Sequence, residues 1–361
     1  MSSTPSAVPL RILLVGEGRS PIHEAAWQRG LEAAGCVARR FNWLSRFHSN
    51  SPLRSILLRA QNQLLAGPAL QALNDDLVAQ VLAKLPDVVI LYRPTHIFAT
   101  TLRIIRSKAP STLLVSYNND DPFSQKAPRH LWRHYLDGVP LVDAALAYRP
   151  KNLAELRAAG ARRAYLLRSY YLPYIHRPVE LTESDRQRYQ ADVSFVGHYE
   201  PDGRMDYLAA AAAAFPSFRL FGPDWDRAPS HPGLRRLRPI QPLSLCEYVK
   251  AIQCAKIALV FFSGLNSDSY TRRVFEIPAI GTFMLSQRTA DMEGLFRPGM
   301  EAAYFASPEE LLNQARRYLA DDQGRSEIAA SAAARVREDG HDIFSRMREL
   351  TALIKEWRAG I

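Results

Sequence analysis

The chain has 361 residues with a formal net charge of +10, and this length predicts two domains of ordinary size. Hydrophobic residues make up 47% and charged residues 23%, as in a globular protein that folds without covalent cross-links. The three cysteines, Cys36, Cys246 and Cys254, have no C-x-x-C spacing. This argues against a disulfide framework or a zinc site and favours a reducing compartment.

The positive charge admits three kinds of partner: nucleic acid, an anionic membrane surface or a phosphorylated substrate. We expect no nucleic-acid partner, because the arginines are spread along the chain and no zinc-finger or RNA-recognition signature occurs. Residues 1–9 lack the basic and apolar regions of a signal peptide, and the apolar run 10–15 is too short to span a bilayer. We therefore expect a soluble cytoplasmic protein.

The N-terminal half alternates short apolar strands with amphipathic helices, a pattern that predicts a parallel sheet covered on both faces. The predicted strands cover residues 11–15, 37–41, 87–92, 112–117, 144–147 and 164–167, and clear helical patterns lie at 22–34 and 70–84. Residues 170–178, with two prolines and clustered aromatic rings, then interrupt the alternation and predict a crossover between domains.

The alternation restarts in the C-terminal half. Here the predicted strands are 192–196, 218–221, 256–262, 282–285 and 302–305, and the helices are 204–215, 245–254, 270–280 and 343–358. The fold class is therefore α/β, with two Rossmann-like domains facing a cleft at the carboxyl ends of their strands. We expect an N-terminal domain at 1–178, a C-terminal domain at 179–340, and a helix at 341–361 that packs back toward the N-terminal domain.

The first strand leads into Gly16-Glu-Gly18, which opens a helix as a dinucleotide-binding loop would. Pro21 stands where the third glycine belongs, however, and Asn42 and Trp43 follow the second strand in place of an acidic residue for a ribose. Hydride chemistry with NAD is therefore not expected. The loop is either a tight strand-to-helix turn or a place where Gly16 and Gly18 let a ligand approach a helix N-terminus.

The strand at 192–196 leads into a second such loop. Gly197 would permit close approach of a diphosphate, and Arg204 stands where the next helix begins. A cation and a helix dipole together suit a pyrophosphate leaving group. An ordinary loop with a solvated arginine fits the same residues equally well.

The most informative segment follows the strand at 256–262. Glu276 lies four residues after Arg272 and three after Arg273, so the three share a helical face. They could form a surface ion pair, but Glu276 has apolar residues on both sides along the chain, and a carboxylate in such surroundings needs polar partners. A ribose diol would supply them.

Residues 271–285, Thr-Arg-Arg-Val-Phe-Glu-Ile-Pro-Ala-Ile-Gly-Thr-Phe-Met-Leu, carry a family resemblance, which continues through 291–301 and 307–311. Over roughly 192–350 the chain resembles the group 1 glycosyltransferase domain of the CgeB-like, spore-maturation-protein-like type. In the N-terminal half only 119–122 match. The resemblance implies a GT-B fold and a hexosyltransferase-type enzyme that moves a sugar from a nucleoside-diphosphate-sugar to a hydroxyl acceptor. It also implies an N-terminal acceptor domain and a C-terminal donor domain.

The resemblance also implies roles for single residues. Glu276 binds the donor ribose, Arg273 and Arg204 face the diphosphate, and Gly197 lines its loop. Tyr270 and Thr271 belong to the same donor-binding segment. Retaining relatives carry two glutamates separated by seven residues; here Asp268, with its shorter reach, occupies the first place and Glu276 the second. We expect no metal or other cofactor, because relatives of this fold stabilise the diphosphate with cations and a helix end.

Asp120 and Asp121 end a strand of the first domain and are the candidate catalytic residues. Such a pair either accepts the proton of an incoming hydroxyl or caps the following helix. Asp121 is the better candidate base, because it precedes Pro122, which biases it toward an extended backbone that projects into the cleft. Glu17 and His96 are the other candidate bases near the cleft.

A basic stretch with aromatic residues lies between the second and third predicted strands. It contains Arg39, Arg40, Trp43, Arg46, Phe47, Arg54 and Arg59. We interpret it as a solvated helix-loop surface. The alternative is contact with anionic lipid or a phosphorylated lipid acceptor at the inner membrane face. His130 and His134 share a helix face, but the sequence offers no further ligand that would make them a metal site.

Two other functions fit the same residues. A nucleotide-sugar isomerase or epimerase on this fold would convert the donor without an acceptor, and product analysis would distinguish it. A non-catalytic nucleotide-sugar-binding protein would bind the donor tightly and turn over no acceptor.

Overall fold

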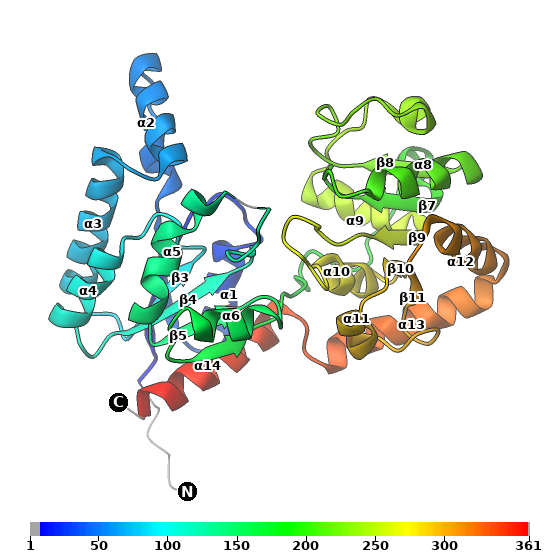
Figure 1. The fold of residues 1–361 in the computed structure, drawn as a ribbon. Coiled ribbons are helices and arrows are strands. Elements are labelled where there is room, and N and C mark those ends of the chain that lie inside the picture. Colours follow the sequence, from blue (N-terminus) through cyan, green and yellow to red (C-terminus); the bar gives the residue numbers. More distant parts are fainter. Residues whose placement is uncertain (1–7, 127, 360–361) are drawn as a thin grey trace, which may run out of the picture. The chain divides into compact units, whose positions relative to one another are not determined.

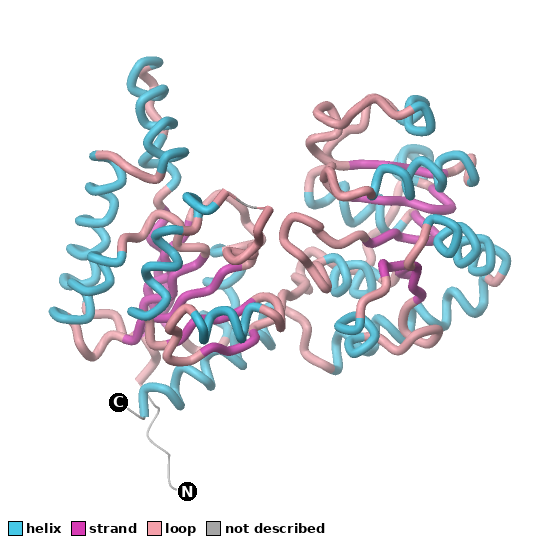
Figure 2. The backbone as a smooth tube through the Cα atoms, in the orientation of Figure 1, coloured by secondary structure: helices cyan, strands magenta, loops and turns pink. Residues whose placement is uncertain are grey.

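The computed structural model describes residues 8–126 and 128–359 and divides the chain into two compact units. The first unit combines Met1–Arg168 with Ile343–Ile361, and the second is Ser169–Asp342. Each unit is a parallel sheet with helices on both faces (Figure 1, Figure 2). The predicted α/β class with two Rossmann-like domains is confirmed.

The sheet of the first unit has the strand order β2-β1-β3-β4-β5-β6, and every neighbouring pair is parallel. Its strands are β1 (Arg11–Gly16), β2 (Val37–Asn42), β3 (Val88–Tyr92), β4 (Leu113–Asn118), β5 (Ala144–Ala147) and β6 (Ala164–Leu166). All residues of β3 and β4 are buried, because central strands of a parallel sheet are covered on both faces. The two strands are therefore mostly apolar along their whole length and show no alternation of polar and apolar residues.

Helices α1 (Glu24–Ala33) and α14 (Ile343–Ala359) pack against each other in the first unit. Gly30 permits this contact, because a β-carbon there would lie 2.5 Å from Cγ of Met347. Near the end of α14, Arg358 pairs with Asp87 at 2.8 Å. The prediction that the C-terminal helix packs back on the N-terminal part of the chain is confirmed. Other helices of the unit are α2 (Pro52–Leu64), α3 (Pro68–Lys84), α4 (Ala99–Lys108), α5 (Arg133–Gly138) and α6 (Asn152–Ala158), with 3-10 turns at Leu44–Phe47, Arg129–Leu131 and Val139–Leu141.

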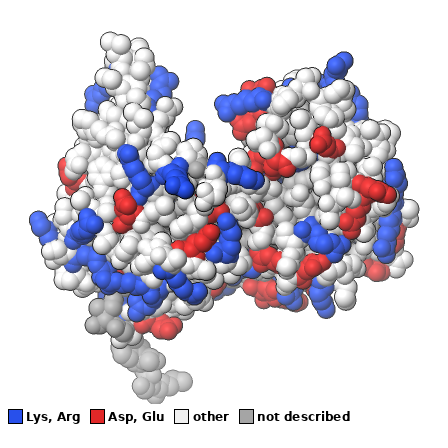
Figure 3. Space-filling view, viewed as in Figure 1, with Lys and Arg blue, Asp and Glu red and all other residues white. Residues whose placement is uncertain are grey.

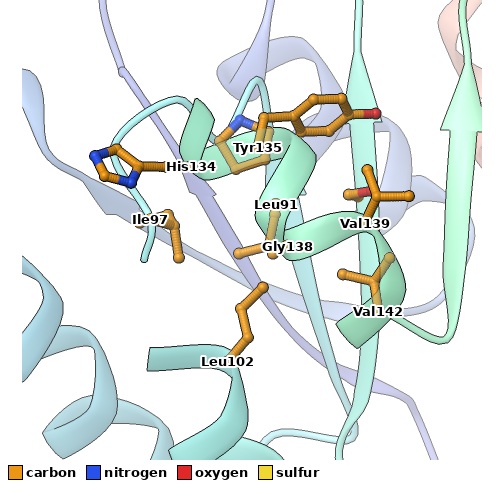
Figure 4. A pocket seen from close by; sticks show the side chains of 10 residues that line it. Leu91, Ile97, Leu102, His134, Tyr135, Gly138, Val139 and Val142 are labelled. Atoms are coloured by element: carbon orange, nitrogen blue, oxygen red, sulfur yellow. The ribbon is translucent and has the colours of Figure 1, made fainter. Parts of the chain in front are cut away.

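A small cavity lies in the core of the first unit between β3, α4 and α5 (Figure 4). Its volume is about 10 Å³, roughly the room that one water molecule needs. Apolar side chains such as Leu91, Leu102 and Val142 form most of its wall. The cavity is a packing gap and has no room for a substrate.

The sheet of the second unit has the order β11-β10-β9-β7-β8, again with parallel neighbours. Its strands are β7 (Ala191–Val196), β8 (Phe218–Phe221), β9 (Ala255–Val260), β10 (Phe283–Gln287) and β11 (Ala303–Phe305). Two groups of helices cover its faces: α8 (Arg204–Ala214) with α12 (Pro308–Ala320), and α9 (Leu245–Gln253), α10 (Arg273–Ile280) and α13 (Asp322–Glu338). Shorter helices are α7 (Glu183–Tyr189), α11 (Ala290–Leu295) and the 3-10 helix Pro232–Leu237.

The eleven predicted strands all form, each within two residues of its predicted ends. The helix predicted at 270–280 begins only at Arg273, so Tyr270 and Thr271 precede it. The segment 169–178, which we expected at the end of the N-terminal domain, lies in the second unit. The backbone N–H of Tyr171 there donates to the carbonyl of His341 at 2.9 Å, which ties this segment to the end of the second unit. Within the described residues, no helix combines the length and apolarity needed to cross a membrane.

Candidate functional site

The second unit has a topological switch point between β7 and β9. Strand β7 is hydrogen-bonded to β8 on one side and to β9 on the other, and the helices that follow β7 and β9 belong to the two different groups. The loops after these two strands therefore part at the carboxyl edge of the sheet, which is where ligands of doubly wound sheets bind. Gly197 directly follows β7, and residues 261–272 follow β9. The structure thus brings the two predicted donor-binding loops together.

Hydrogen bonds join these two loops. The Ser263 hydroxyl donates to Oε2 of Glu200 at 2.7 Å, and the backbone N–H of Gly264 donates to Asp202 at 3.4 Å. Burial alone would raise the pKa of Glu200. The hydrogen bond from His198 and the charge of Arg204 outweigh that effect, so the pKa is lowered and Glu200 stays ionised. The two loops at this edge of the sheet are therefore joined by a network of polar and charged side chains.

Arg204 is buried at the start of α8 and is only 4% exposed. Its Nε donates to Oδ1 of Asp202 at 2.8 Å, its Nη2 pairs with the other oxygen of Asp202, and its Nη1 donates to the carbonyl of His198 at 3.1 Å. We predicted that Arg204 faces a diphosphate, but here its guanidinium holds the loop 198–202 against the helix start.

Gly197 is required by packing around the end of β7. A β-carbon at this position would lie 2.5 Å from the ring of Phe195. The carbonyl of Gly197 accepts a hydrogen bond from the indole N–H of Trp225 at 2.9 Å. These contacts explain the glycine without a ligand, which is the plainer of the two sequence interpretations.

Two neighbouring arginines at the start of α10 differ in their contacts: Arg272 is held by side chains of the second unit, whereas Arg273 has no such partner among the described residues. Tyr270 is fully buried, and its hydroxyl accepts from the backbone N–H of Ser169 at 2.9 Å. Arg272 donates from Nε to the Ser169 hydroxyl at 3.3 Å and lies over the ring of Tyr170. Arg273, the first residue of α10, is half-buried and makes no side-chain hydrogen bond or ion pair with the residues that the structure describes.

Two further predicted residues of this segment, Asp268 and Thr271, are half-buried. The backbone N–H of Asp268 donates to the carbonyl of Ser263 at 3.0 Å, which closes the loop after β9. Thr271 accepts from the backbone N–H of Val274 through its own carbonyl at 3.1 Å as α10 begins. Both residues therefore lie at the same carboxyl edge as Arg273.

Glu276 lies in the first turn of α10 and is 6% exposed. Its Oε2 accepts from the Tyr248 hydroxyl at 2.9 Å, and its Oε1 lies 3.6 Å from Nε2 of His176. The other ring nitrogen of His176 accepts from the backbone N–H of Leu172 at 2.9 Å, which assigns the ring proton to Nε2. Burial is the main cause that lowers the pKa of His176, and Glu276 opposes it in part. The predicted ribose-binding carboxylate therefore has polar partners, Tyr248 and His176, that the sequence did not indicate.

The first unit has its own switch point between β1 and β3. The loop Gly16–Gly18 folds over Glu24, a residue of the first turn of α1 that is 2% exposed, and the backbone N–H of Gly18 donates to its Oε1 at 3.2 Å. Burial is the main cause that raises the pKa of Glu24, and hydrogen bonds from the loop backbone, including that of Glu17, oppose it. A carboxylate thus occupies the place beneath this loop, so the tight-turn interpretation of Gly16 and Gly18 accounts for them.

Arg93 joins two of the predicted cleft residues. It lies just after β3, where its Nε contacts Asp120 at 2.6 Å and its Nη1 lies 3.8 Å from Glu17. The side chains of Asp120 and Glu17 remain 26% and 23% exposed. The structure therefore gathers carboxylates from the ends of β1 and β4 around one arginine that the sequence analysis did not single out.

Asp121 does not project from the strand end as we expected. Its side chain is fully buried, with Oδ2 at 2.6 Å from Lys151 and Oδ1 accepting from Asn152 at 2.9 Å. Lys151 and Asn152 open α6, so Asp121 ties the end of β4 to that helix. The expectation of a projecting carboxylate was wrong, because the Asp121 side chain points inward and bonds to Asn152, which opens a helix 31 residues later in the chain.

His96 is also buried, at 5% exposure, and both its ring nitrogens are bonded. Nδ1 lies 2.8 Å from the Thr95 hydroxyl and Nε2 lies 2.8 Å from Oδ1 of Asn62, while the ring stacks on Trp43. Burial, assisted by the charge of Arg93, lowers the pKa of His96 to about 3. His96 is therefore a neutral structural histidine at physiological pH.

Among the described residues, no group of three or more His, Cys, Asp or Glu side chains is placed to hold a metal ion. His134 lies 2.9 Å from the carbonyl of Leu65, and His130 is exposed. The pair we discounted as a metal site therefore has no third ligand in the described part of the chain.

Residues 204–352 match a family model described as glycosyl transferase-like. No curated protein sequence matches the chain. The match supports the group 1 glycosyltransferase resemblance over this part of the chain, and the CgeB-like subgroup stays a prediction.

Three solved structures share the fold over nearly the whole chain. HepE from Anabaena, in complex with UDP and glucose, is 14% identical, with 96% of this chain and 100% of that chain covered and a TM-score of 0.68. Sucrose-phosphate synthase from Thermosynechococcus elongatus is 14% identical, with 97% and 99% covered and a TM-score of 0.67. A UDP-forming trehalose-phosphate synthase from Burkholderia vietnamiensis is 10% identical, with 98% and 99% covered and a TM-score of 0.66. The chain therefore has the fold of the GT-B glycosyltransferases.

Proposed function

We propose that the protein is a glycosyltransferase that moves a hexose-type sugar from a nucleoside-diphosphate-sugar to a hydroxyl acceptor. The similar HepE has been solved with UDP and with UDP-glucose, and the family match at 204–352 covers the segment that contains Arg273 and Glu276. The proposal places the donor nucleotide at the carboxyl edge of β7 and β9. It includes the cytoplasmic location that the cysteine usage predicts.

The observation that carries the proposal is Arg273. It begins an eight-residue helix at the switch point, and its guanidinium has no partner among the described residues, whereas those of Arg272 and Arg204 do. A cation at a helix start stabilises the charge that develops on a leaving diphosphate. In this proposal Arg273 contacts the diphosphate, and Arg204 positions the loop after β7 through Asp202.

The environment of Glu276 also favours a nucleotide at the carboxyl edge of β7 and β9. An ionised carboxylate has about four acceptor positions. Tyr248 takes one of them at Oε2, and His176 lies beside Oε1. The remaining positions suit the two hydroxyls of a ribose. Because Glu276 and Arg273 lie in the same first turn of α10, one nucleoside diphosphate can reach both.

The acceptor hydroxyl needs a proton acceptor if the enzyme inverts the anomeric centre. Of the two predicted aspartates, Asp120 is the better supported, because its carboxylate is partly exposed while that of Asp121 is buried against Lys151. We propose no metal and no other cofactor, since arginine and the helix start perform the electrostatic work.

The first experiment is a thermal-shift screen of nucleoside diphosphates and their sugars, because a ligand that binds only the folded state raises the melting temperature. The hit is then titrated by calorimetry against Arg273→Gln and the matched variant Arg272→Gln. We expect Arg273→Gln to weaken the diphosphate about tenfold or more and to leave the corresponding nucleoside unaffected, since hydrogen bonds to charged groups have this magnitude.

Equal affinity of Arg273→Gln and the wild type for the diphosphate would contradict the assigned site. Transfer assays with the donor that binds then identify the reaction. A product sugar isomer formed without any acceptor would identify an epimerase instead, and tight binding without turnover would identify a nucleotide-sugar-binding protein.

A further inference from the structure

Helix α2 carries an apolar stripe on its outer side. Leu53, Ile56, Leu57 and Leu64 are 77%, 56%, 63% and 65% exposed, and they are four of the eleven large hydrophobic side chains that are exposed in the described residues. Their spacing of three, four and seven residues, with Ala60 between them, places them on one face of the helix. A stripe of this kind normally faces a protein core, so its exposure needs an explanation.

The opposite face of α2 fastens the helix to its unit. Leu58 and Leu65 are buried, at 8% and 2% exposure, and Asn62 bonds to Nε2 of His96 at 2.8 Å. Leu58 and Asn62 lie four residues apart and form a separate inner face, and Leu65 directly follows the helix end. The helix is therefore held in place by one side and presents the apolar stripe on the other. Figure 1 shows α2 standing out from the body of its unit.

The charges on α2 itself have one sign. The chain contains no acidic residue between Glu32 and Asp75, and α2 itself carries Arg54 and Arg59, both exposed. By helical spacing these two arginines lie on either flank of the stripe, between it and the inner face. Arg133 adds a third exposed cation at the end of α2, where its Nη2 donates to the carbonyls of Leu64 and Leu65 at 2.9 and 2.6 Å. Figure 3 shows this protrusion as a white tip with Lys or Arg side chains on its flanks.

We infer that α2 is a membrane-docking helix that lies in the headgroup region of an anionic lipid surface. An apolar face buried at the acyl boundary with arginines beside it is the arrangement by which interfacial helices bind anionic membranes. The long arginine side chains extend to the phosphate level while the leucines enter the bilayer. The charge favours a lipid surface over a second copy of this chain, because two copies of a cationic face would repel each other. The inference rests on α2 alone and stands or falls independently of the proposed transferase activity.

The test is flotation of the full-length protein with vesicles of phosphatidylcholine alone or of phosphatidylcholine with phosphatidylglycerol. We expect the wild type to float with the anionic vesicles only, and less so as salt is raised. The double variant Leu53→Ser with Leu57→Ser should reduce the bound fraction about tenfold or more, because each leucine contributes on that scale when it is buried. Arg54→Gln with Arg59→Gln should weaken binding and its salt dependence.

Met300→Ser, which changes a 54% exposed side chain in the other unit, is the matched control and should bind as the wild type does. Because all these side chains are exposed, circular dichroism and the melting temperature should remain those of the wild type. A second readout is Leu57→Trp, whose added fluorescence should be quenched by lipids with brominated acyl chains. The inference is overturned if the wild type ignores anionic vesicles or if the double leucine variant binds them equally well. It is also overturned if sedimentation shows a dimer that the leucine substitutions dissociate, because the occupant would then be a second copy.

Discussion

Glu276 owes its position to two partners from other parts of the second unit. Tyr248 comes from the first turn of α9, His176 from the segment before α7, and Glu276 itself from the first turn of α10. Burial, followed by the charge of Glu276, raises the pKa of Tyr248 well above its ordinary value, so its hydroxyl remains a donor to the carboxylate. The three side chains thus keep one buried negative charge in place beside Arg273.

Replacing Glu276 tests the proposed contact with a ribose. We expect Glu276→Ala to weaken nucleoside diphosphate binding by roughly 1–3 kcal/mol, the cost of leaving the ribose hydroxyls unpaired. Glu276→Gln, which keeps an acceptor for Tyr248, should retain the fold and lose part of the affinity. Calorimetry with nucleosides and deoxynucleosides isolates the ribose contact. Unchanged affinity of a folded Glu276→Ala protein would show that the nucleotide binds elsewhere.

Asp120 and Asp121 are neighbours in the chain with different environments. Asp121→Asn should lower stability, because it leaves the ammonium group of Lys151 without its buried carboxylate. Asp120→Asn should leave the melting temperature and donor affinity nearly unchanged. If the enzyme inverts, this variant should lose transfer by about 10²–10⁴-fold, the usual contribution of a general base.

The measurements for this pair are the unfolding midpoint, the donor Kd and the transfer rate, together with the anomeric configuration of the product by NMR. Transfer within a few-fold of wild type in Asp120→Asn, with an inverted product, would remove Asp120 as the base. A retained product would instead assign the proton to the leaving phosphate.

At the scale of elements, the strands were predictable because buried parallel strands are short apolar runs, such as Val88–Tyr92 and Ala255–Val260. The switch-point loops were predictable for the same reason, since they follow strands directly. The partners of Arg204 and Asp121 were not. Their contacts depend on how a loop folds back to Asp202 and on where α6 begins, and neither leaves a periodic signal in the sequence.

His96 links α2 to the loop after β3, and its protonation should weaken this link at acid pH. The pKa of His96 is lowered from 6.5 to about 3 in the folded state, chiefly by burial. Between these values the unfolded chain binds a proton that the folded chain does not, so folding stability falls as pH decreases from 6.5 toward 3. The slope is up to about 1.4 kcal/mol per pH unit.

Urea unfolding between pH 4 and pH 7.5, compared for the wild type and His96→Gln, measures this effect. The variant should be less stable at neutral pH because it loses the ring that stacks on Trp43, but its stability should fall less steeply with acid. Parallel pH profiles for the two proteins would show that His96 titrates normally in the folded state.

At the scale of the whole molecule, the chain carries two parallel sheets, each with a switch point, and a net charge of +10. The two switch points differ in chemistry. In the second unit Arg273, which has no side-chain partner among the described residues, begins a helix, whereas in the first unit Glu24 fills the space beneath the glycine loop. We therefore propose the second unit as the site of an anionic donor, because Arg273 supplies a cation there.

This asymmetry leads to a prediction about metal ions. A nucleoside diphosphate leaving group needs its charge neutralised by cations of the protein or by a divalent metal. In the part of the chain that the structure describes, no group of three metal-ligating side chains occurs, and Arg273 with the start of α10 offers the protein's own cation. We therefore expect transfer to persist within a few-fold after exhaustive chelation, and Arg273→Gln to remove most of it. Activity lost on chelation and restored by magnesium or manganese would contradict the expectation. Asp120 and Glu17, both held by Arg93, would then be the first residues to test as ligands.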